Sequence, residues 1–535
     1  SFEGWPVLLA VGLLISLPVF LFGVPYGLDL PHHYRIAQGF QEALAGGNFY
    51  PSWLASTNGG YGDPSLRFYP PALYYLLSCA RLLTGDWYYA SLLSIALLTL
   101  TGCLGIYLWA RTLLADWRYA VIAALVYSLA PYHANELYQA GMYGQYAAAC
   151  ILPFTFAFAE RIIQHRRLSD VAGCGLSYGL LILFHVPLAV LSTITLAIYC
   201  LLRLTETRRF VSLYRLTAGA LLGVALSCCY WLPVMRELKW KFPSGAGQGE
   251  WFNYRNNFLF QQSPSEMSNF LLPMLTAGTI LIAAPAAILF FKRDRKALAP
   301  ALAALCAFLM ATPLSRPLWD ALPILQETQF PWRWMTPLSA CLSILVALSF
   351  PALASLRRTR WRPFALALMG LLVIALSFTV LQLMRGATFR GHAAFNGFVD
   401  SLPGSATNKD FLPIWASEPR PMNLRVEAGE RSVDVSEWSA ERRVFQIDAG
   451  LASEARLRTF YYPYWVATSG QQVLPTKPAD DGALLIGVPQ QAATINVEFR
   501  EPLSSKVAGA VSLAGLFAAL GLLLSQRLQQ RRART

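Results

Sequence analysis

The sequence predicts an α-helical polytopic membrane protein with about twelve spans, cytoplasmic N and C termini, and an extracytoplasmic all-β domain before the last span. Composition is the first reason: 55% of the 535 residues are hydrophobic and 14% are charged, whereas soluble domains are about 45–50% apolar and about 25% charged. The other two reasons are apolar runs of span length and basic residues gathered between them. These features exclude a cytosolic enzyme, a secreted disulfide scaffold and a disordered protein.

The apolar runs provide the spans, because about 20 apolar residues cross the roughly 30 Å of hydrocarbon in a bilayer. The run 169–202 is too long for one span and is interrupted by His185 and Pro187, so we interpret it as a hairpin of two spans. The other ten predicted spans are residues 5–24, 88–110, 118–132, 142–163, 212–234, 269–291, 298–312, 337–356, 364–384 and 507–525.

Basic residues decide the orientation of these spans. Of the 43 Lys and Arg residues, 21 lie in the six short segments 111–118, 161–167, 203–215, 292–296, 357–362 and 527–534. The positive-inside rule places these segments in the cytoplasm, so the net charge of +13 indicates topology rather than a nucleic-acid partner. The same orientation leaves residues 72–83 outside, as an interfacial helix that begins after Pro70 and Pro71.

Three outer segments are long enough to carry a function: 25–87, 235–268 and 385–506. We therefore divide the chain into a membrane module, 1–384, a β-sandwich-like domain, 385–506, and a last helix with a basic tail, 507–535. Strands are predicted from β-rich runs at 431–435, 441–448, 455–461, 464–469, 483–488 and 493–499, separated by Gly, Pro and Asp. The domain is interpreted either as a recognition module for the acceptor or a partner, or as a stabilising cap. In the second segment, 244–249 is either a loop that orders over bound substrate or a solvated linker.

The first outer loop carries the strongest candidates for chemistry. Asp29 precedes a helix predicted to run to about Ala45, and Pro31 suits the first turn of that helix. Residues 29 and 33 share a helical face, so Asp29 and His33 are expected to converge, with His32 turned elsewhere. The alternatives are a simple N-cap for Asp29 and a buried histidine with satisfied bonds for His33.

A glycine-rich stretch follows at Asn58-Gly-Gly-Tyr-Gly-Asp63. Its glycines allow backbone to approach a ligand closely, and polar and aromatic groups surround them. Asp63 before Pro64 is also typical of a turn. In residues 58–71 the candidates for binding substrate are Tyr61, Asp63 and Tyr69, and Arg67 is a candidate for the donor phosphate; His32 is a further candidate for binding substrate.

Several motifs resemble those of the integral-membrane glycosyltransferases of the GT-C superfamily, and in particular of the bacterial membrane proteins called "6-pyruvoyl-tetrahydropterin synthase related" and their YfhO-type relatives. The pterin in that name finds no support in the sequence, which has no zinc-histidine pattern. The matching motifs are Asp29–His33, Tyr50-Pro-Ser-Trp53, Gly60-Tyr-Gly62, Phe68-Tyr-Pro-Pro71, Phe184-His-Val-Pro187, Gln329-Phe-Pro-Trp-Arg333 and Phe460-Tyr-Tyr-Pro-Tyr-Trp465.

The resemblance implies transfer of a sugar from a polyprenyl-phosphate donor on the outer face of a bacterial inner membrane, to a glycan, lipid or protein acceptor. It assigns Asp29 as the general base, and Glu136 and His133 as candidates in the next outer loop. It also leaves open a divalent cation, Mg²⁺ or Mn²⁺, held by Asp29 and Glu136, although an Asp-x-Asp motif is absent there. His185 is expected to brace the substrate cavity.

Arg333 is the first candidate for the donor phosphate, with Arg67 as a weaker one. A guanidinium binds phosphate in a bidentate manner, and the flanking Trp332 and Trp334 are typical of a membrane interface. The alternative for Arg333 is an ordinary snorkelling side chain.

Two other functions remain open. A transporter or flippase of a lipid-linked glycan also suits twelve spans, but it predicts internal repeats and charged midplane helices, which the sequence does not display. A non-catalytic scaffold of envelope assembly would tolerate the loss of Asp29.

Overall fold

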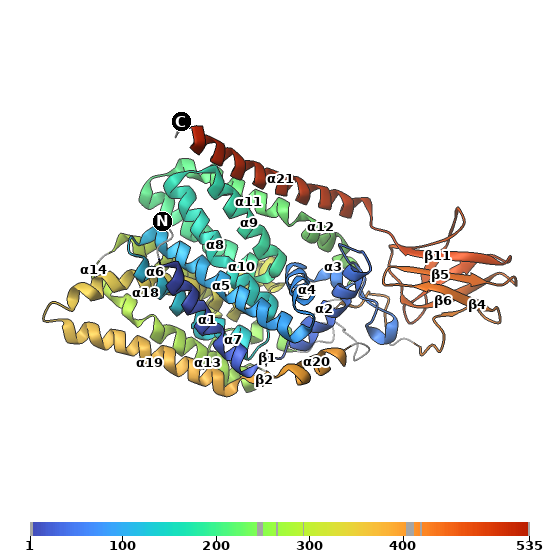
Figure 1. The fold of residues 1–535 in the computed structure, drawn as a ribbon, viewed down its shortest axis with the longest axis horizontal. Helices are drawn as coiled ribbons and strands as arrows, with labels where there is room; N and C mark the ends of the chain where they lie inside the picture. The colour runs from blue at the N-terminus through green and yellow to red at the C-terminus, as the bar shows by residue number, and fades with distance from the viewer. Residues whose placement is uncertain are drawn as a thin grey trace.

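The computed structural model describes residues 4–242, 250–263, 266–292, 294–402, 411–417 and 420–532. A bundle of helices forms most of the molecule, and a β domain projects from one end of it (Figure 1). Helix α1 (Trp5–Phe22) begins, and helix α21 (Leu503–Arg532) ends, on the side of the bundle away from the β domain (Figure 1).

The helices are regular over apolar runs and break at Gly, Pro and polar residues. They are α1 (Trp5–Phe22), α2 (Leu30–Ala45), α3 (Ser65–Phe68), α4 (Ala72–Thr84), α5 (Trp87–Leu113), α6 (Trp117–Ser128), α7 (Pro131–Tyr138), α8 (Tyr143–His165), α9 (Leu168–Phe184), α10 (Val186–Thr207), α11 (Leu213–Leu226), α12 (Cys228–Glu237), α13 (Glu266–Ile282), α14 (Ala287–Lys292), α15 (Leu298–Met310), α16 (Arg316–Ala321), α17 (Pro323–Gln326), α18 (Met335–Leu356), α19 (Arg362–Gly386), α20 (His392–Asp400) and α21 (Leu503–Arg532).

Eight helical segments within the described residues are long and apolar enough to cross a membrane, and two bent pairs raise the count to ten. The bent pairs are Phe210–Leu226 with Cys228–Trp240 and Arg295–Met310 with Pro313–Ala321. The remaining two predicted spans fall on α9, which has 17 residues, and α6, which has 12. At 1.5 Å per residue, α6 covers only about 18 Å, so twelve full spans remain a prediction.

Segments outside the bundle join distant parts of the chain. Strand β1 (Val24–Tyr26) pairs antiparallel with β2 (Thr388–Arg390), with Val24 opposite Arg390. Helix α20 follows β2, and its Phe395 and Val399 are buried in the core of the helical module. The predicted domain boundary at residue 385 is therefore too early, because residues 388–402 pack with the membrane module.

The β domain is built from two antiparallel sheets. One has the strand order β3-β6-β10-β9 and the other β4-β5-β11-β7-β8. The strands are β3 (Val426–Glu427), β4 (Val433–Trp438), β5 (Arg442–Ile447), β6 (Ser453–Phe460), β7 (Trp465–Ser469), β8 (Gln472–Leu474), β9 (Thr476–Pro478), β10 (Ala483–Val488) and β11 (Ala493–Phe499). All six predicted strands are confirmed, and β3, β8 and β9 are short additional ones.

The first outer loop fixes the β domain to the helical module. Trp53 and Tyr61 of this loop are buried in the hydrophobic core of the β domain. The Phe460 N–H donates to the Tyr61 carbonyl at 2.9 Å, and the Tyr61 hydroxyl donates to the Arg420 carbonyl at 2.6 Å. The loop is thus part of the β domain's packing rather than a free connection.

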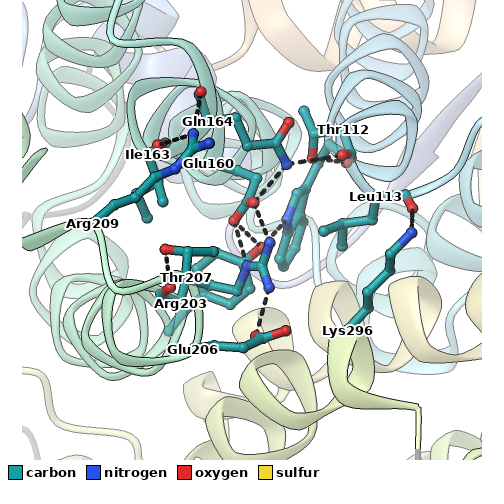
Figure 2. A network of polar contacts seen from close by, with 12 residues as sticks. Thr112, Leu113, Glu160, Ile163, Gln164, Arg203, Glu206, Thr207, Arg209 and Lys296 are labelled. Carbon is teal, nitrogen blue, oxygen red and sulfur yellow. Dashed lines mark hydrogen bonds and ion pairs between the residues drawn. The ribbon is translucent and has the colours of Figure 1, made fainter.

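The end of the bundle far from the β domain holds a buried ion pair (Figure 2). Arg203 on α10 donates to both carboxylate oxygens of Glu160 on α8, at 2.9 and 2.6 Å. Tyr199 and Gln164 also donate to Glu160, at 2.9 and 2.7 Å. Arg203, expected in a cytoplasmic loop, is instead a buried side chain that joins two helices.

Candidate active site at the outer end of the helical module

Asp29 lies between β1 and α2, where two stretches of backbone touch. A Cβ on Gly27 would lie 2.3 Å from the Gly141 nitrogen, and Gly141 itself has φ +66°, a conformation that favours glycine. The Asp29 N–H donates to the Ala140 carbonyl at 3.2 Å. This contact places Asp29 beside the turn that follows α7.

The Asp29 side chain does not act as a helix cap. Asp29 occupies the N-cap position of α2, but its carboxylate accepts no capping hydrogen bond. The residue is exposed, and its charge acts on Tyr74 of α4 and on Arg333. The carboxylate therefore lies within electrostatic range of groups of the site.

His33 and His32 both contact Tyr69. His33 is buried, its ring lies 5.7 Å from that of Tyr69, and its Nδ1 lies 3.5 Å from the Tyr74 hydroxyl. The His32 ring lies 5.2 Å from Tyr69 and stacks on Phe411 at 5.7 Å. The expectation that His32 turns elsewhere is therefore wrong, because Tyr69 sits where both rings reach it.

Burial keeps both imidazoles neutral. Burial, with a smaller contribution from His32, lowers the pKa of His33 to about 3. Burial and the Arg35 charge lower the pKa of His32 to about 4. At neutral pH each ring has one donor and one acceptor nitrogen, so both can orient hydroxyl groups without adding charge.

Glu136 is fully buried on α7 and accepts three hydrogen bonds from side chains. Its Oε1 accepts from Gln145 at 2.8 Å and from Thr336 at 2.6 Å. Its Oε2 lies 3.2 Å from His133 Nδ1, and the His133 ring is stacked between Tyr127 and Tyr146, at 4.6 and 4.9 Å. A buried carboxylate needs such donors, and here they come from α7, α8 and α18.

Arg333 begins the segment that leads into α18 and is also buried. Its Nε donates to Gln145 Oε1 at 3.1 Å and its Nη1 to the Thr328 carbonyl at 2.6 Å. The guanidinium lies 4.8 Å from the centre of the Phe330 ring, which stacks on Trp332 at 4.6 Å. These aromatic side chains hold Arg333 in place beneath the outer surface, so it is not a snorkelling side chain.

Gln145 joins Arg333 to Glu136 without letting them pair. Its carbonyl oxygen accepts from Arg333, and its amide nitrogen donates to Glu136 and to the Tyr132 hydroxyl, both at 2.8 Å. The two charges are therefore linked through a neutral amide. A guanidinium has five N–H donors, and the described bonds of Arg333 use Nε and Nη1.

His185 has a structural role in the turn between α9 and α10. Its Nδ1 accepts from the Leu188 N–H at 3.1 Å and so caps α10. The predicted helical hairpin is confirmed by this turn. The charge of Arg333 acts on His185, so His185 lies near the site, and its role as a brace of the cavity stays a prediction.

Asp63 and Tyr61 are used by the protein's own structure. The Asp63 carboxylate is buried and accepts from the Ser65 N–H at 2.8 Å, from Thr57 at 2.7 Å and from Asn58 at 3.1 Å. Burial raises the pKa of Asp63 in spite of these bonds. With Tyr61 in the β-domain core, neither side chain is directed to a substrate, and the turn interpretation fits Asp63.

Arg67 is likewise already paired. It donates to both oxygens of Glu237 at 2.6 Å and also to Glu501. Burial alone would lower its pKa, but Glu237 and Glu501 raise the pKa of Arg67 above its ordinary value. Two carboxylates therefore occupy the guanidinium that was expected to bind phosphate.

The side chains of the described residues do not form a binding site for a divalent cation. No group of three or more His, Cys, Asp or Glu side chains that could hold a metal is found among the residues that the structure describes. The Glu136 oxygens accept bonds from Gln145, Thr336 and His133, whereas Mg²⁺ requires several oxygen ligands free for it.

Gln145 and Thr336 were not predicted as site residues, although Gln145 lies near the start of the predicted span 142–163 and Thr336 directly precedes the predicted span 337–356. A polar side chain inside an apolar run is a functional candidate, and this signal was available for Gln145. Glu237 and Glu501 were also missed, and no local pattern relates either of them to Arg67. The predicted mobile stretch 244–249 lies outside the described residues.

Comparisons with known proteins cover part of the chain. A family model described as "6-pyruvoyl-tetrahydropterin synthase related domain; membrane protein" matches residues 66–385. No curated protein sequence matches the chain.

Solved structures of three other proteins are similar in part. ArnT from Cupriavidus metallidurans bound to undecaprenyl phosphate is 19% identical over 70% of this chain and 64% of its own, with a TM-score of 0.44. Arabinofuranosyltransferase AftD from Mycobacteria is 17% identical over 72% and 27%, with a TM-score of 0.46. The oligosaccharyltransferase AglB from Archaeoglobus fulgidus, in complex with an inhibitory peptide and a dolichol-phosphate, is 14% identical over 76% and 57%, with a TM-score of 0.42. The chain spans less than two thirds of the length of each.

Proposed function

The chain belongs to the family of 6-pyruvoyl-tetrahydropterin synthase related membrane proteins, and from this premise we propose that it is a GT-C-type glycosyltransferase that uses a polyprenyl-phosphate sugar. We place it in a bacterial inner membrane with the site facing outward. The observation that carries the proposal is that Asp29 is held beside the end of α7, whose Glu136 is linked through Gln145 to the buried cation Arg333. The site, rather than the pterin in the family's description, indicates the chemistry.

The transfer needs three groups. An acceptor hydroxyl forms a bond to the anomeric carbon as the bond from that carbon to the phosphate oxygen breaks. Asp29 accepts the hydroxyl proton as general base, while Arg333 stabilises the negative charge of the departing polyprenyl phosphate. His33, which is neutral and buried, positions the acceptor.

Separation of charge supports these assignments. Arg333 and Glu136 are joined through Gln145 instead of directly, so the guanidinium keeps N–H groups for an anionic ligand. A phosphate that arrives from the membrane surface needs only a cation just beneath that surface, and stacking on aromatic rings fixes this one.

The test is transfer by the purified protein in lipid vesicles, with a panel of radiolabelled undecaprenyl-phosphate hexoses and pentoses and with extracted envelope glycan as acceptor. We expect Asp29→Asn to reduce kcat by about 10²- to 10⁴-fold, the usual range for a general base, with KM for the donor nearly unchanged. Arg333→Lys keeps the charge but loses the bidentate fork, and we expect it to raise that KM by about tenfold.

Asp86→Asn is the matched control, because Asp86 also occupies the N-cap position of a helix, α5, and is not one of the residues of the site. It is expected to retain normal transfer. Normal transfer by Asp29→Asn would contradict the base assignment, and glycan movement across the vesicle membrane without transfer would favour a flippase.

A further inference from the structure

Arg333 keeps one nitrogen for a ligand, and its neighbours decide which nitrogen that is. Nε donates to Gln145 Oε1 at 3.1 Å, and Nη1 donates to the Thr328 carbonyl at 2.6 Å. Nη2 has no hydrogen-bond partner among the described residues, and it is not sealed from solvent as the indole nitrogens of Trp332 and Trp334 are. Because a guanidinium is planar and rigid, the bond to the Thr328 carbonyl also sets the direction of Nη2.

The turn that presents this carbonyl is strained. The Phe330 N–H donates to the Thr328 carbonyl at 2.7 Å, which closes a turn of three residues, and its central residue, Gln329, has φ +64°. A three-residue turn with a positive central φ is rare and strained, and such strain gathers at sites where a group must be held for function. Here the turn directs one carbonyl to both the Phe330 N–H and Arg333 Nη1.

Residues 250–260 of the second outer segment pack against this turn. The Trp251 and Phe252 rings lie 5.9 and 5.8 Å from the Phe330 ring. The same Phe330 ring stacks on Trp332 at 4.6 Å, and its centre lies 4.8 Å from the Arg333 guanidinium. Phe330 therefore contacts the second outer segment and the cation at once, so a shift of residues 251 and 252 reaches Arg333 through a single ring.

Residues 250–260 are themselves fixed to the helical module. The Tyr254 ring stacks on that of the buried Trp319 of α16 at 5.6 Å. Asn257 is also buried, and its side-chain amide donates to the Trp251 carbonyl at 2.5 Å. The packing of Trp251 on Phe330 is therefore part of an ordered unit and is not the contact of a free loop.

We propose that the turn at Gln329 and the rings of Trp251 and Phe252 position Arg333 so that Nη2 meets the phosphate of the polyprenyl-phosphate donor. The inference rests on the proposed function and deepens it, because it names the residues that set the affinity for the donor. Gln329, Trp251 and Phe252 are positioning residues, since they act through a carbonyl and a ring that contact Arg333. Disturbing this arrangement is expected to weaken donor binding rather than to slow the chemical step.

The test uses the full-length protein in lipid vesicles and compares Gln329→Gly, the variant that preserves the backbone, with Gln329→Val. Glycine adopts a positive φ readily, whereas a β-branched residue does not, so only valine should displace the Thr328 carbonyl. We expect Gln329→Gly to keep KM for the donor within about twofold of its normal value, and Gln329→Val to raise it at least about fivefold with kcat little changed. A purely structural role would lower Tm and the active fraction, and so the apparent kcat, and would leave KM unchanged.

The double variant Trp251→Ala, Phe252→Ala removes the packing on the turn without changing the residue at its centre, and we expect it to raise the donor KM about fivefold. Phe260→Val is the matched control for Gln329→Val. Phe260 also has a positive φ, +65°, and lies in the second outer segment, but its ring is exposed and its described ring contact is with Phe308. The control carries the same backbone cost, so we expect its Tm to fall and its KM to stay unchanged.

Binding of undecaprenyl phosphate, measured on the same variants without any sugar, separates this inference from the proposed function. We expect its Kd to change in parallel with the donor KM. Equal Kd values for Gln329→Gly and Gln329→Val, a rise in Kd caused by Phe260→Val, or no binding of undecaprenyl phosphate would each overturn the positioning role, whether or not the protein transfers sugar. Binding that depends on the turn in a protein without any transfer would instead overturn the proposed enzyme and leave the positioning role standing.

Discussion

Helix α8 connects two buried polar clusters that hold their charges in different ways. Near its end, Glu160 and Arg203 form a direct two-bond pair, and Arg203 makes a second ion pair with Glu206. Near its start, about 22 Å away, Gln145 separates Arg333 from Glu136. The first cluster satisfies its own charges, whereas the second keeps a cation that another anion can use. The difference teaches that a buried charge indicates a ligand site only where its partner is held at a distance.

The largest expected effect on stability comes from breaking the ion pair between Glu160 and Arg203. Arg203→Ala would leave Glu160 buried without its partner, and removal of one member of such a pair costs about 3–5 kcal/mol. We expect a large fall in Tm, measured by tryptophan fluorescence of the protein in detergent, with the transfer rate at low temperature retained.

Two variants serve as controls for this prediction. Arg209→Ala removes an exposed arginine that bonds only to carbonyls of the same cluster (Figure 2), and we expect a loss of about 1 kcal/mol or less. The double variant Glu160→Leu, Arg203→Met should regain part of the stability, because no charge remains buried. An equal fall in Tm for Arg203→Ala and Arg209→Ala would contradict the comparison.

A smaller effect is expected when Arg333 is given a direct carboxylate partner, as Arg203 has in Glu160. Gln145→Glu places a carboxylate against Arg333, so the guanidinium becomes half of a closed pair. We expect KM for the polyprenyl-phosphate donor to rise about tenfold, equivalent to about 1.4 kcal/mol. We also expect Tm to fall, because the new carboxylate replaces the amide that donates to Glu136 and repels that buried carboxylate.

Gln145→Met is the control that distinguishes the added negative charge of Gln145→Glu from the loss of the Gln145 amide. It removes the amide without adding a negative group, so its KM should rise less than that of Gln145→Glu. If both variants raise KM equally, the negative charge at position 145 is not what weakens donor binding.

The smallest expected effect is on the pH dependence of stability, and it comes from the buried, neutral His33. The pKa of His33 falls from 6.5 to about 3 on folding, so between these values the unfolded chain binds the extra proton and stability is lost as pH falls. One such group contributes at most about 1.4 kcal/mol per pH unit. We expect the Tm of His33→Asn to fall less steeply than that of the unaltered protein between pH 6.5 and 4.5, and parallel curves would contradict it.

A feature of the fold or of the site could be predicted from the sequence where the residues that form it are close together in the chain. The α2 helix and the six strands were predicted because periodicity and turn residues are local signals. Arg67 was interpreted as a phosphate ligand because nothing near it shows that Glu237 and Glu501 fill its guanidinium. Asp29, Glu136 and Arg333 were named as candidates from the sequence, but the role of Gln145 in joining Glu136 to Arg333 follows only from the packing of α7, α8 and α18.

The pairing of β1 with β2 bears on how the protein is made. Val24 emerges from the ribosome before its partner Arg390, and most of the helices lie between them in the chain. Contacts between residues so far apart in sequence form late and slowly. We expect the loop that carries Asp29 to wait outside the membrane without its final partners during synthesis, so that the site is completed only when residues 388–402 have crossed. A stalled nascent chain that ends before residue 388 should therefore be inserted in the membrane but unable to act.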